Sequence, residues 1–156
     1  MAIKVFSFGK IDKKSYGDDI DRYIKMMQPW SKTEMVTLKG KTIGSSAQKD
    51  ALLAQEAQQL LKGIRPSTTI CSLAEEGTTM TTEAFAQWLG VQLSTQGDIR
   101  FLIGSAYGLD EELKKNSDLL LSLLPMTMPY KLARLVFVEQ LYRALSVLQN
   151  HPYHKE

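Results

Sequence analysis

The last seven residues of the chain contain most of the side chains that could do chemistry near neutral pH. This tail, Asn-His-Pro-Tyr-His-Lys-Glu at positions 150–156, holds both histidines of the protein, His151 and His154. An unperturbed histidine has a pKa close to neutrality, so His154 can move a proton, and Tyr153 can stack on a nucleobase. A disordered terminus explains any one of these residues, but less readily the cluster.

A glycine-bounded loop is the second candidate site. The apolar run Phe101–Leu109 breaks between Gly104 and Gly108, and Asp110 then caps a predicted helix. Ligands of open α/β sheets bind at the carboxyl ends of strands, where this loop is expected to lie. The alternative is an ordinary turn in which the glycines supply positive φ angles.

The last predicted helix, 131–148, contains two further groups of charged residues. Glu139 and Arg143 are four residues apart in the order that favours an ion pair, which serves either structure alone or orientation of a group across a dimer. Lys131 and Arg134 open the helix, where cations oppose the helix dipole. They indicate either an anionic partner such as a phosphate or a solvated first turn.

Several chemistries are excluded by the absence of their motifs. The glycine spacing matches neither a phosphate-binding P-loop nor a dinucleotide fingerprint, and neither Ser105 nor Ser122 lies in a nucleophile elbow. No histidine and cysteine set has zinc spacing, so we expect no metal. The single cysteine, Cys71, allows no internal disulfide and is expected to be a small buried hydrophobe.

Composition indicates one globular domain over residues 1–156. Hydrophobic residues make up 44% of the chain, and the net charge of +2 does not by itself indicate a nucleic-acid binder, although a basic patch can form locally or across two subunits. The amino terminus has no signal-peptide pattern, and no apolar run is long enough to span a membrane. We therefore expect a cytoplasmic protein.

Strand and helix patterns alternate along the chain, which predicts an α/β fold with a mostly parallel sheet flanked by helices. Ser45 and Gln48 fit a capping box, residues 77–82 form a threonine-rich loop, and residues 95–98 form a turn. The apolar run 119–124 is expected to be buried on both faces. Strands are predicted at 2–9, 34–38, 68–73, 99–103 and 119–124. Helices are predicted from 16 up to Pro29, from 45 to a stop at Gly63, around 85–89, at 110–116 and at 131–148.

The helix at 131–148 is apolar nearly all round, and such a helix must be covered on more than one side. In so small a domain a second subunit would supply that cover. The pattern therefore predicts a homodimer through this helix, with Leu141 and Leu145 in the interface.

Five short motifs, in order, resemble one family. They are Leu-Ile-Gly-x-x-x-Gly-Leu at 102–109, Met-Thr-Met-Pro at 126–129, Arg134, Val-Glu-Gln-Leu-Tyr-Arg-Ala at 138–144, and the tail. Together they resemble the ribosomal RNA large-subunit methyltransferase H family of the SPOUT superfamily, over nearly the whole chain. Ser105, Tyr130 and Lys155 depart from the glycine, histidine and arginine that are common in the family.

The resemblance implies a SPOUT-type fold with a carboxyl-terminal trefoil knot, a homodimer, and methyl transfer from S-adenosyl-L-methionine to N3 of a pseudouridine in 23S rRNA on the assembled ribosome. By position, Tyr153 and His154 would lie at the target base, with Arg134, Glu139 and Arg143 in support. Gly104 would let the cofactor come close, and Ser105 would make that loop bulkier. The residues that would surround the cofactor are Leu73, Gly104, Leu123, Leu124, Pro125, Met126, Thr127 and Met128.

Two other functions remain open: a non-catalytic ribosome- or RNA-binding relative with the same fold, and a methyltransferase acting on another RNA or a small molecule. The intact Tyr-His-Lys in the tail favours the enzyme, because a pure binder has little reason to keep it. Whether His154 is a general base or a hydrogen-bonding positioner is also open.

Overall fold

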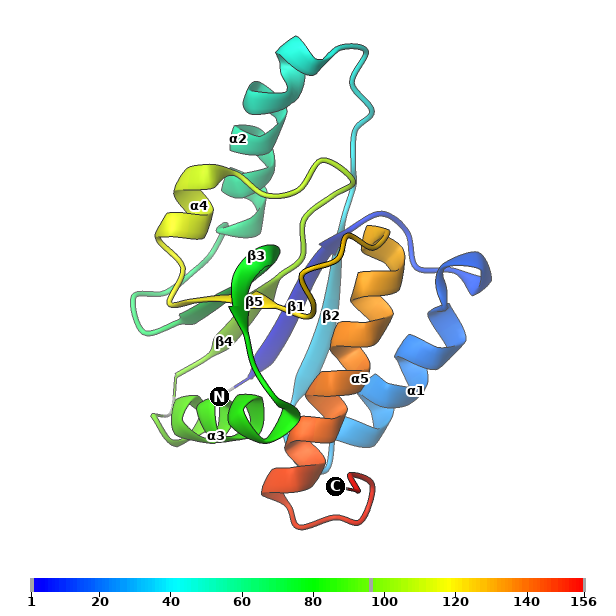
Figure 1. Ribbon diagram of the computed structural model, residues 1–156, viewed down its shortest axis with the longest axis vertical. Coiled ribbons are helices and arrows are strands. Elements are labelled where there is room, and N and C mark those ends of the chain that lie inside the picture. The colour runs from blue at the N-terminus through cyan, green and yellow to red at the C-terminus, as the bar shows by residue number, and fades with distance from the viewer. Residues whose placement is uncertain (1, 96, 156) are drawn as a thin grey trace.

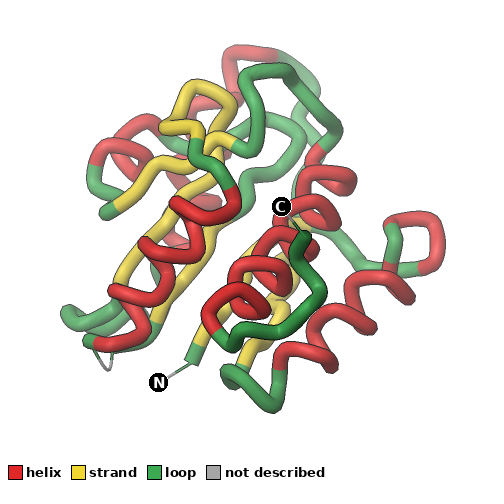
Figure 2. Tube along the Cα trace, turned by 60° about the horizontal axis from the view of Figure 1, so that its bottom comes forward, coloured by secondary structure: helices red, strands yellow, loops and turns green. Residues whose placement is uncertain are grey.

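Five parallel strands form the centre of the molecule (Figures 1 and 2). The computed structural model describes residues 2–95 and 97–155. The strands lie in the order β2-β1-β4-β3-β5 and every pairing is parallel, which confirms the predicted α/β class. Their bounds are β1 Ile3–Phe8, β2 Thr33–Leu38, β3 Thr69–Thr79, β4 Ile99–Leu102 and β5 Leu119–Ser122.

Helices cover both faces of the sheet (Figure 1). Because side chains of a strand alternate between faces, Ile3 of β1 belongs to one hydrophobic core and Phe8 to the other. The larger core includes Leu141, and the smaller one includes Leu60. The larger core is covered by α1 (Gly17–Met27), α3 (Thr82–Ser94) and α5 (Tyr130–Leu148). The smaller core is covered by α2 (Lys49–Leu60) and α4 (Glu111–Lys115). Two short 3-10 turns are η1 (Lys13–Ser15) and η2 (Ser46–Gln48).

The apolar helix α5 is covered mainly by its own chain. It packs against α1 and α3, and Leu141 and Leu145 are 0% and 1% exposed. The expectation that these two leucines lie in a subunit interface is therefore wrong, because α1, α3 and the sheet already bury them. The homodimer itself stays a prediction. A different face of α5 is only half-buried, and it consists of Leu132, Leu135, Val136, Glu139, Gln140, Arg143 and Val147.

Strand β3 is longer and β5 shorter than the sequence predicts. The expected loop 77–82 is strand through Thr79, because the pairing with β5 shifts between Leu73 and Thr78 and the β-branched Thr78 and Thr79 rejoin the sheet. Gly77 is required here, since a Cβ at this residue would lie 2.6 Å from the Leu120 carbonyl oxygen. β5 is an edge strand, so its first two residues are only half-buried.

The capping box predicted at Ser45 does not form. The Ser45 side chain makes no cap hydrogen bond, and Gln48 Oε1 instead accepts from the Gly44 N–H at 3.2 Å. A 3-10 turn therefore precedes α2, which begins at Lys49. The predicted turn 95–98 includes Gln96, and the tail ends at Glu156; both residues, like Met1, lie outside the described ones.

No helix in residues 2–95 and 97–155 has the length and apolarity needed to cross a membrane. The trefoil knot implied by the resemblance stays a prediction.

Arg134 is buried, contrary to the suggestion that it faces an anionic partner. Its side chain is 0% exposed, and Nη1 donates to the Phe8 and Gly9 carbonyl oxygens at 3.1 Å each and to Ser7 Oγ at 3.2 Å. Nη2 points to the Lys10 carbonyl at 3.5 Å. The guanidinium therefore donates hydrogen bonds to carbonyl oxygens at the end of β1. Lys131, the other cation of this turn, is exposed.

Replacing Arg134 by leucine tests this role. We expect Arg134→Leu to lower the free energy of unfolding by about 3 kcal/mol or more, because each buried acceptor left without a donor costs about 1–3 kcal/mol. Lys131→Met, in the same helical turn, is the control and should change it by less than about 0.5 kcal/mol. Urea unfolding of both variants measures the difference, and equal midpoints would contradict the role of the guanidinium.

Candidate active site

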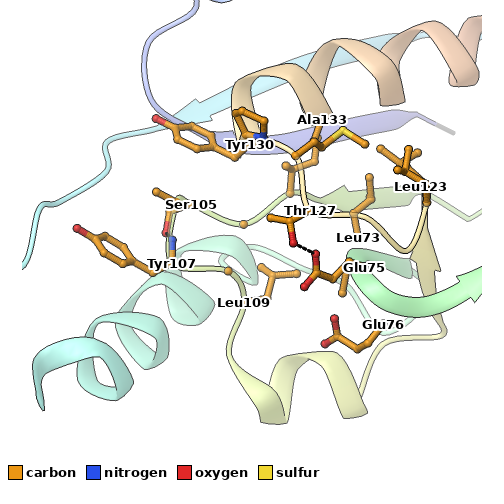
Figure 3. Close-up of a pocket in the computed structure, with 18 of the residues that line it drawn as sticks. Leu73, Glu75, Glu76, Ser105, Tyr107, Leu109, Leu123, Thr127, Tyr130 and Ala133 are labelled. Carbon is orange, nitrogen blue, oxygen red and sulfur yellow. Dashed lines mark hydrogen bonds between the residues drawn. The ribbon is translucent and has the colours of Figure 1, made fainter. Parts of the chain in front are cut away.

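A cavity of about 780 Å³ opens at the carboxyl edge of the sheet (Figure 3). Its walls come from residues 73–76 inside β3, where the pairing with β5 shifts, from the segments that follow β4 and β5, from Lys114 of α4, and from the first turn of α5. Seven of the eight residues expected around a cofactor line it, and Pro125 does not. The seven are Leu73, Gly104, Leu123, Leu124, Met126, Thr127 and Met128; further lining residues that sequence reasoning missed include Glu75, Glu76, Tyr107, Tyr130 and Ala133.

Gly104 is explained by the closure of its own loop. A Cβ at Gly104 would lie 2.5 Å from the Gly108 carbonyl oxygen, far inside van der Waals contact. Ser105 and Gly108 pair in an isolated β-bridge, and Gly108 has a φ of 88°. The structure thus gives a reason for glycine at 104 that differs from the close approach of a ligand.

Ser105 ties the loop to α2. Its hydroxyl donates to Glu56 Oε1 at 2.8 Å, and the Glu56 side chain lies inside the protein with only 5% of the residue exposed. Burial raises the pKa of Glu56, and the hydrogen bond from Ser105 partly opposes that shift. Glu56 Oε2 has no hydrogen-bond partner among the described residues. Ser105, which stands where the resembled family commonly has glycine, therefore anchors the loop through its hydroxyl.

Two glutamates in the bulged middle of β3 line the cavity. Glu75 Oε2 accepts from Thr127 Oγ1 at 2.5 Å, which joins β3 to the loop after β5, and Figure 3 shows the two side chains facing each other. Glu76 pairs with Lys114 Nζ at 2.7 Å, and this bond lowers the pKa of Glu76. Glu75 has no ion-pair partner in the described part of the chain. The cavity wall thus presents a carboxylate that suits a positively charged ligand.

The tail folds back onto the end of α5 through a Schellman turn. Asn150 has a φ of 54°, the His151 N–H donates to the Ser146 carbonyl at 2.9 Å, and the Asn150 N–H donates to that of Val147 at 3.1 Å. This reversal lets the Tyr153 ring pack edge-on against Tyr142, with centroids 4.6 Å apart.

All four residues expected to be catalytic belong to one network at this end of α5. Glu139 Oε1 accepts from Arg143 Nε at 3.0 Å and from the Tyr153 hydroxyl at 3.1 Å, which confirms the predicted ion pair. Arg143 Nη1 lies 3.2 Å from His154 Nδ1. The bond to Glu139 raises the pKa of Arg143. Burial and hydrogen bonds to Tyr23 and Glu139 raise the pKa of Tyr153, so its hydroxyl stays protonated.

Other members of this network come from distant parts of the chain. The Tyr23 hydroxyl, from α1, lies 3.4 Å from that of Tyr153, and Glu83 Oε1, from α3, lies 2.7 Å from His154 Nε2. Trp30 stacks on Tyr142 and also contacts the His151 ring. Helical spacing marks Tyr23 only as an apolar residue of α1, and no local signal links Glu83 to the tail.

Within one chain, the cavity and the tail network lie apart along α5. Ala133 lines the cavity, and Arg143 is ten residues further on, which is about 15 Å along a helix. Figure 1 shows α5 running away from the carboxyl edge of the sheet, with the end of the chain beyond its far end.

Comparison with known proteins identifies the family. A family model described as "Predicted SPOUT methyltransferase" matches residues 1–154. The chain belongs to the SPOUT methyltransferase family. Proteins named ribosomal RNA large subunit methyltransferase H from Streptococcus mutans and Limosilactobacillus fermentum are each 36% identical to it, over 99% of this chain and 100% of theirs. The one from Caldicellulosiruptor bescii is 33% identical over 98% of this chain and 99% of its own.

A solved structure supports the fold. The structure of a methylase family protein from Haemophilus influenzae matches with a TM-score of 0.53 and 14% identity, over 99% of this chain and 70% of that one. At this identity the match concerns the fold alone, and it agrees with the SPOUT-type α/β architecture.

The buried carboxyl of Glu56 predicts a pH-dependent stability. Its pKa is raised in the folded protein, so the folded state holds this proton more tightly than the unfolded chain does. This contribution to stability is present at low pH and is lost as the pH rises through the raised pKa. We therefore expect Glu56→Gln to gain stability relative to the wild type between about pH 5 and about pH 8. Urea midpoints at both pH values measure the change, and a constant difference would contradict it.

Proposed function

We propose that this methyltransferase transfers a methyl group from S-adenosyl-L-methionine to N3 of a pseudouridine in 23S rRNA, on the assembled ribosome in the cytoplasm. The observation that supports this most is the cavity, because it gathers residues of β3, of the loop after β4 and of the loop after β5, including two of the five motifs, into one site. Relatives named ribosomal RNA large subunit methyltransferase H match along their full length. The alternatives lack a comparable supporting observation.

The cavity suits this cofactor in size and in chemistry. Its volume of about 780 Å³ lies in the range of small-molecule and cofactor sites. The backbones of loops 104–108 and 123–128 offer donors and acceptors for an adenine, and apolar side chains such as Leu73 and Leu123 flank them. The Glu75 carboxylate favours a cation. When bound, S-adenosyl-L-methionine supplies an activated methyl group on a positively charged sulfur.

The tail network would act at the target base. Because the methyl donor is already activated, the protein must mainly hold the base in line and help it lose the N3 proton. Tyr153, held by Glu139 and Tyr142, offers a rigid ring and a protonated hydroxyl. Arg143 offers hydrogen-bond donors to a base or a phosphate. His154 offers the ring nitrogen that accepts or donates the proton.

The separation of the two sites supports a homodimer. Methyl transfer needs donor and acceptor in contact. In one chain, however, the cavity lies at the first turn of α5 and the tail network lies near its carboxyl end. The half-buried face of α5, with Leu132 and Val136, leads from one site to the other. A second copy with its α5 antiparallel would bring its tail to the cavity of the first, as in an isologous interface. The active site would then be shared by two chains.

The test of the activity is methyl transfer from radiolabelled S-adenosyl-L-methionine to 70S ribosomes, free 50S subunits and naked rRNA. We expect label in the 23S rRNA of 70S ribosomes, and little in the other two substrates. Equal label in all three, or none in any, would contradict the proposal. Calorimetry with the cofactor separates the enzyme from a non-catalytic ribosome-binding relative, which would bind ribosomes but not S-adenosyl-L-methionine.

Mixing two inactive variants tests the shared site. Ala106→Trp fills the cavity from an exposed loop position, and His154→Ala disables the tail. Each alone should be inactive. Co-expressed in equal amounts, they should restore about a quarter of the wild-type activity, because half of the dimers would be mixed and each would hold one intact site. The control for subunit exchange is a chain that carries both Ala106→Trp and His154→Ala, co-expressed with the wild-type chain. No recovery in the first mixture would contradict a site shared between chains.

A further inference from the structure

The His154 ring lies between two groups of opposite charge. Nδ1 is 3.2 Å from Arg143 Nη1, and Nε2 is 2.7 Å from Glu83 Oε1. The His154 side chain is 14% exposed, so most of the ring is shielded from water. A guanidinium can only donate hydrogen bonds and a carboxylate can only accept them. The two contacts therefore fit one arrangement: Nδ1 holds the lone pair, and Nε2 carries the proton that it donates to Glu83.

Glu83 is held for this contact by the start of α3. Thr81 caps the helix by accepting from the Ala84 N–H at 3.1 Å, which places Glu83 in the first turn, where the helix dipole favours a carboxylate. Thr82 Oγ1 donates to Gln140 Oε1 at 2.9 Å and so ties this turn to α5. The hydrogen bond from His154 lowers the pKa of Glu83, which keeps the carboxylate ionised.

We propose that Glu83 is a positioning residue that fixes His154 with its proton on Nε2 and its lone pair on Nδ1, and so makes Nδ1 the nitrogen that meets the target base. This inference rests on the proposed function, in which His154 acts on that base. In the reacting complex the N3–H of the base would take the place of the Arg143 N–H at Nδ1, because that nitrogen has a single lone pair and accepts one hydrogen bond.

The resulting step balances its atoms and electrons. The N3 proton passes to Nδ1 of His154, the electron pair left on N3 forms the bond to the methyl carbon, and the bond from that carbon to sulfur breaks with its pair going to sulfur. The cofactor leaves as a neutral thioether. The imidazolium that forms is stabilised by the Glu83 carboxylate against Nε2, by the same logic that pairs a carboxylate with the histidine of a catalytic triad.

The test combines the nitrogen NMR of the histidine rings with kinetics on 70S ribosomes, using the full chain. His151→Gln assigns the two rings, since the protein has only two histidines. In the wild type we expect His154 to be neutral with its proton on Nε2. Glu83→Leu removes the acceptor at Nε2 and leaves Arg143 at Nδ1, so it should weaken the preference for the Nε2–H form and lower kcat by about 100-fold. KM should change little, because Glu83 does not touch the substrate.

Glu83→Gln separates the hydrogen bond from the charge. The amide oxygen can still accept from Nε2–H, so the tautomer should persist while the stabilisation of the imidazolium is lost, and kcat should lie between those of Glu83→Leu and the wild type. Glu34→Gln, an exposed carboxylate on β2, is the matched control and should leave both readouts unchanged.

A proton on Nδ1 in the wild type would overturn the proposal, as would a Glu83→Leu variant that keeps the single Nε2–H form and the wild-type kcat. If the wild type methylates no ribosomal substrate, the proposed function fails. The NMR result still shows whether Glu83 sets the ring, so the two failures are distinguishable.

Discussion

The buried guanidinium of Arg134 fixes the relation between the last helix and the first strand, and much of the molecule depends on it. A charged group taken out of water needs hydrogen-bond partners, and the carbonyls of Phe8 and Gly9 supply them only when α5 begins at the end of β1. The same first turn of α5 places Tyr130 and Ala133 in the cavity wall. The free-energy cost of burying the guanidinium thus constrains where α5 begins relative to β1.

Helix α5 then transmits that constraint to the other end of the molecule. Its 19 residues span about 28 Å, and packing against α1 and α3 keeps them in place. One end borders the cavity, and the other positions Arg143 and the turned-back tail. Because a packed helix does not bend to bring its ends together, the separation of the two sites is a built-in property of the chain. Under the proposed function, this rigidity is what makes a second copy necessary.

Polar bonds between distant segments hold both sites in shape. In the cavity, Ser105 is tied to Glu56 of α2, and Thr127 to Glu75 of β3. At the tail, Glu83 of α3 holds the ring of His154 across 71 positions of sequence. The loop after β4 also buries Ile103 and Leu109 in the two cores, so these polar bonds add to its apolar packing.

Local order was determined by the sequence alone. Strand and helix periodicities located the elements, Asp110 caps α4 as predicted, and Glu139 pairs with Arg143, because each of these features depends on residues a few positions apart. Seven of the eight residues that the motif resemblance places around a cofactor line one cavity, and their role in binding it stays a prediction.

Only the tertiary structure decided the rest. It turned Arg134 inward, buried Leu141 within its own chain, continued β3 past its bulge, and brought Glu83 to His154. The apolar pattern of a helix is the same whether the same chain or a second chain buries it. Nothing in the local sequence of a polar residue indicates a hydrogen-bond partner that is distant along the chain. Such contacts exist only once the sheet and its helices have packed, so no short-range pattern could have predicted them.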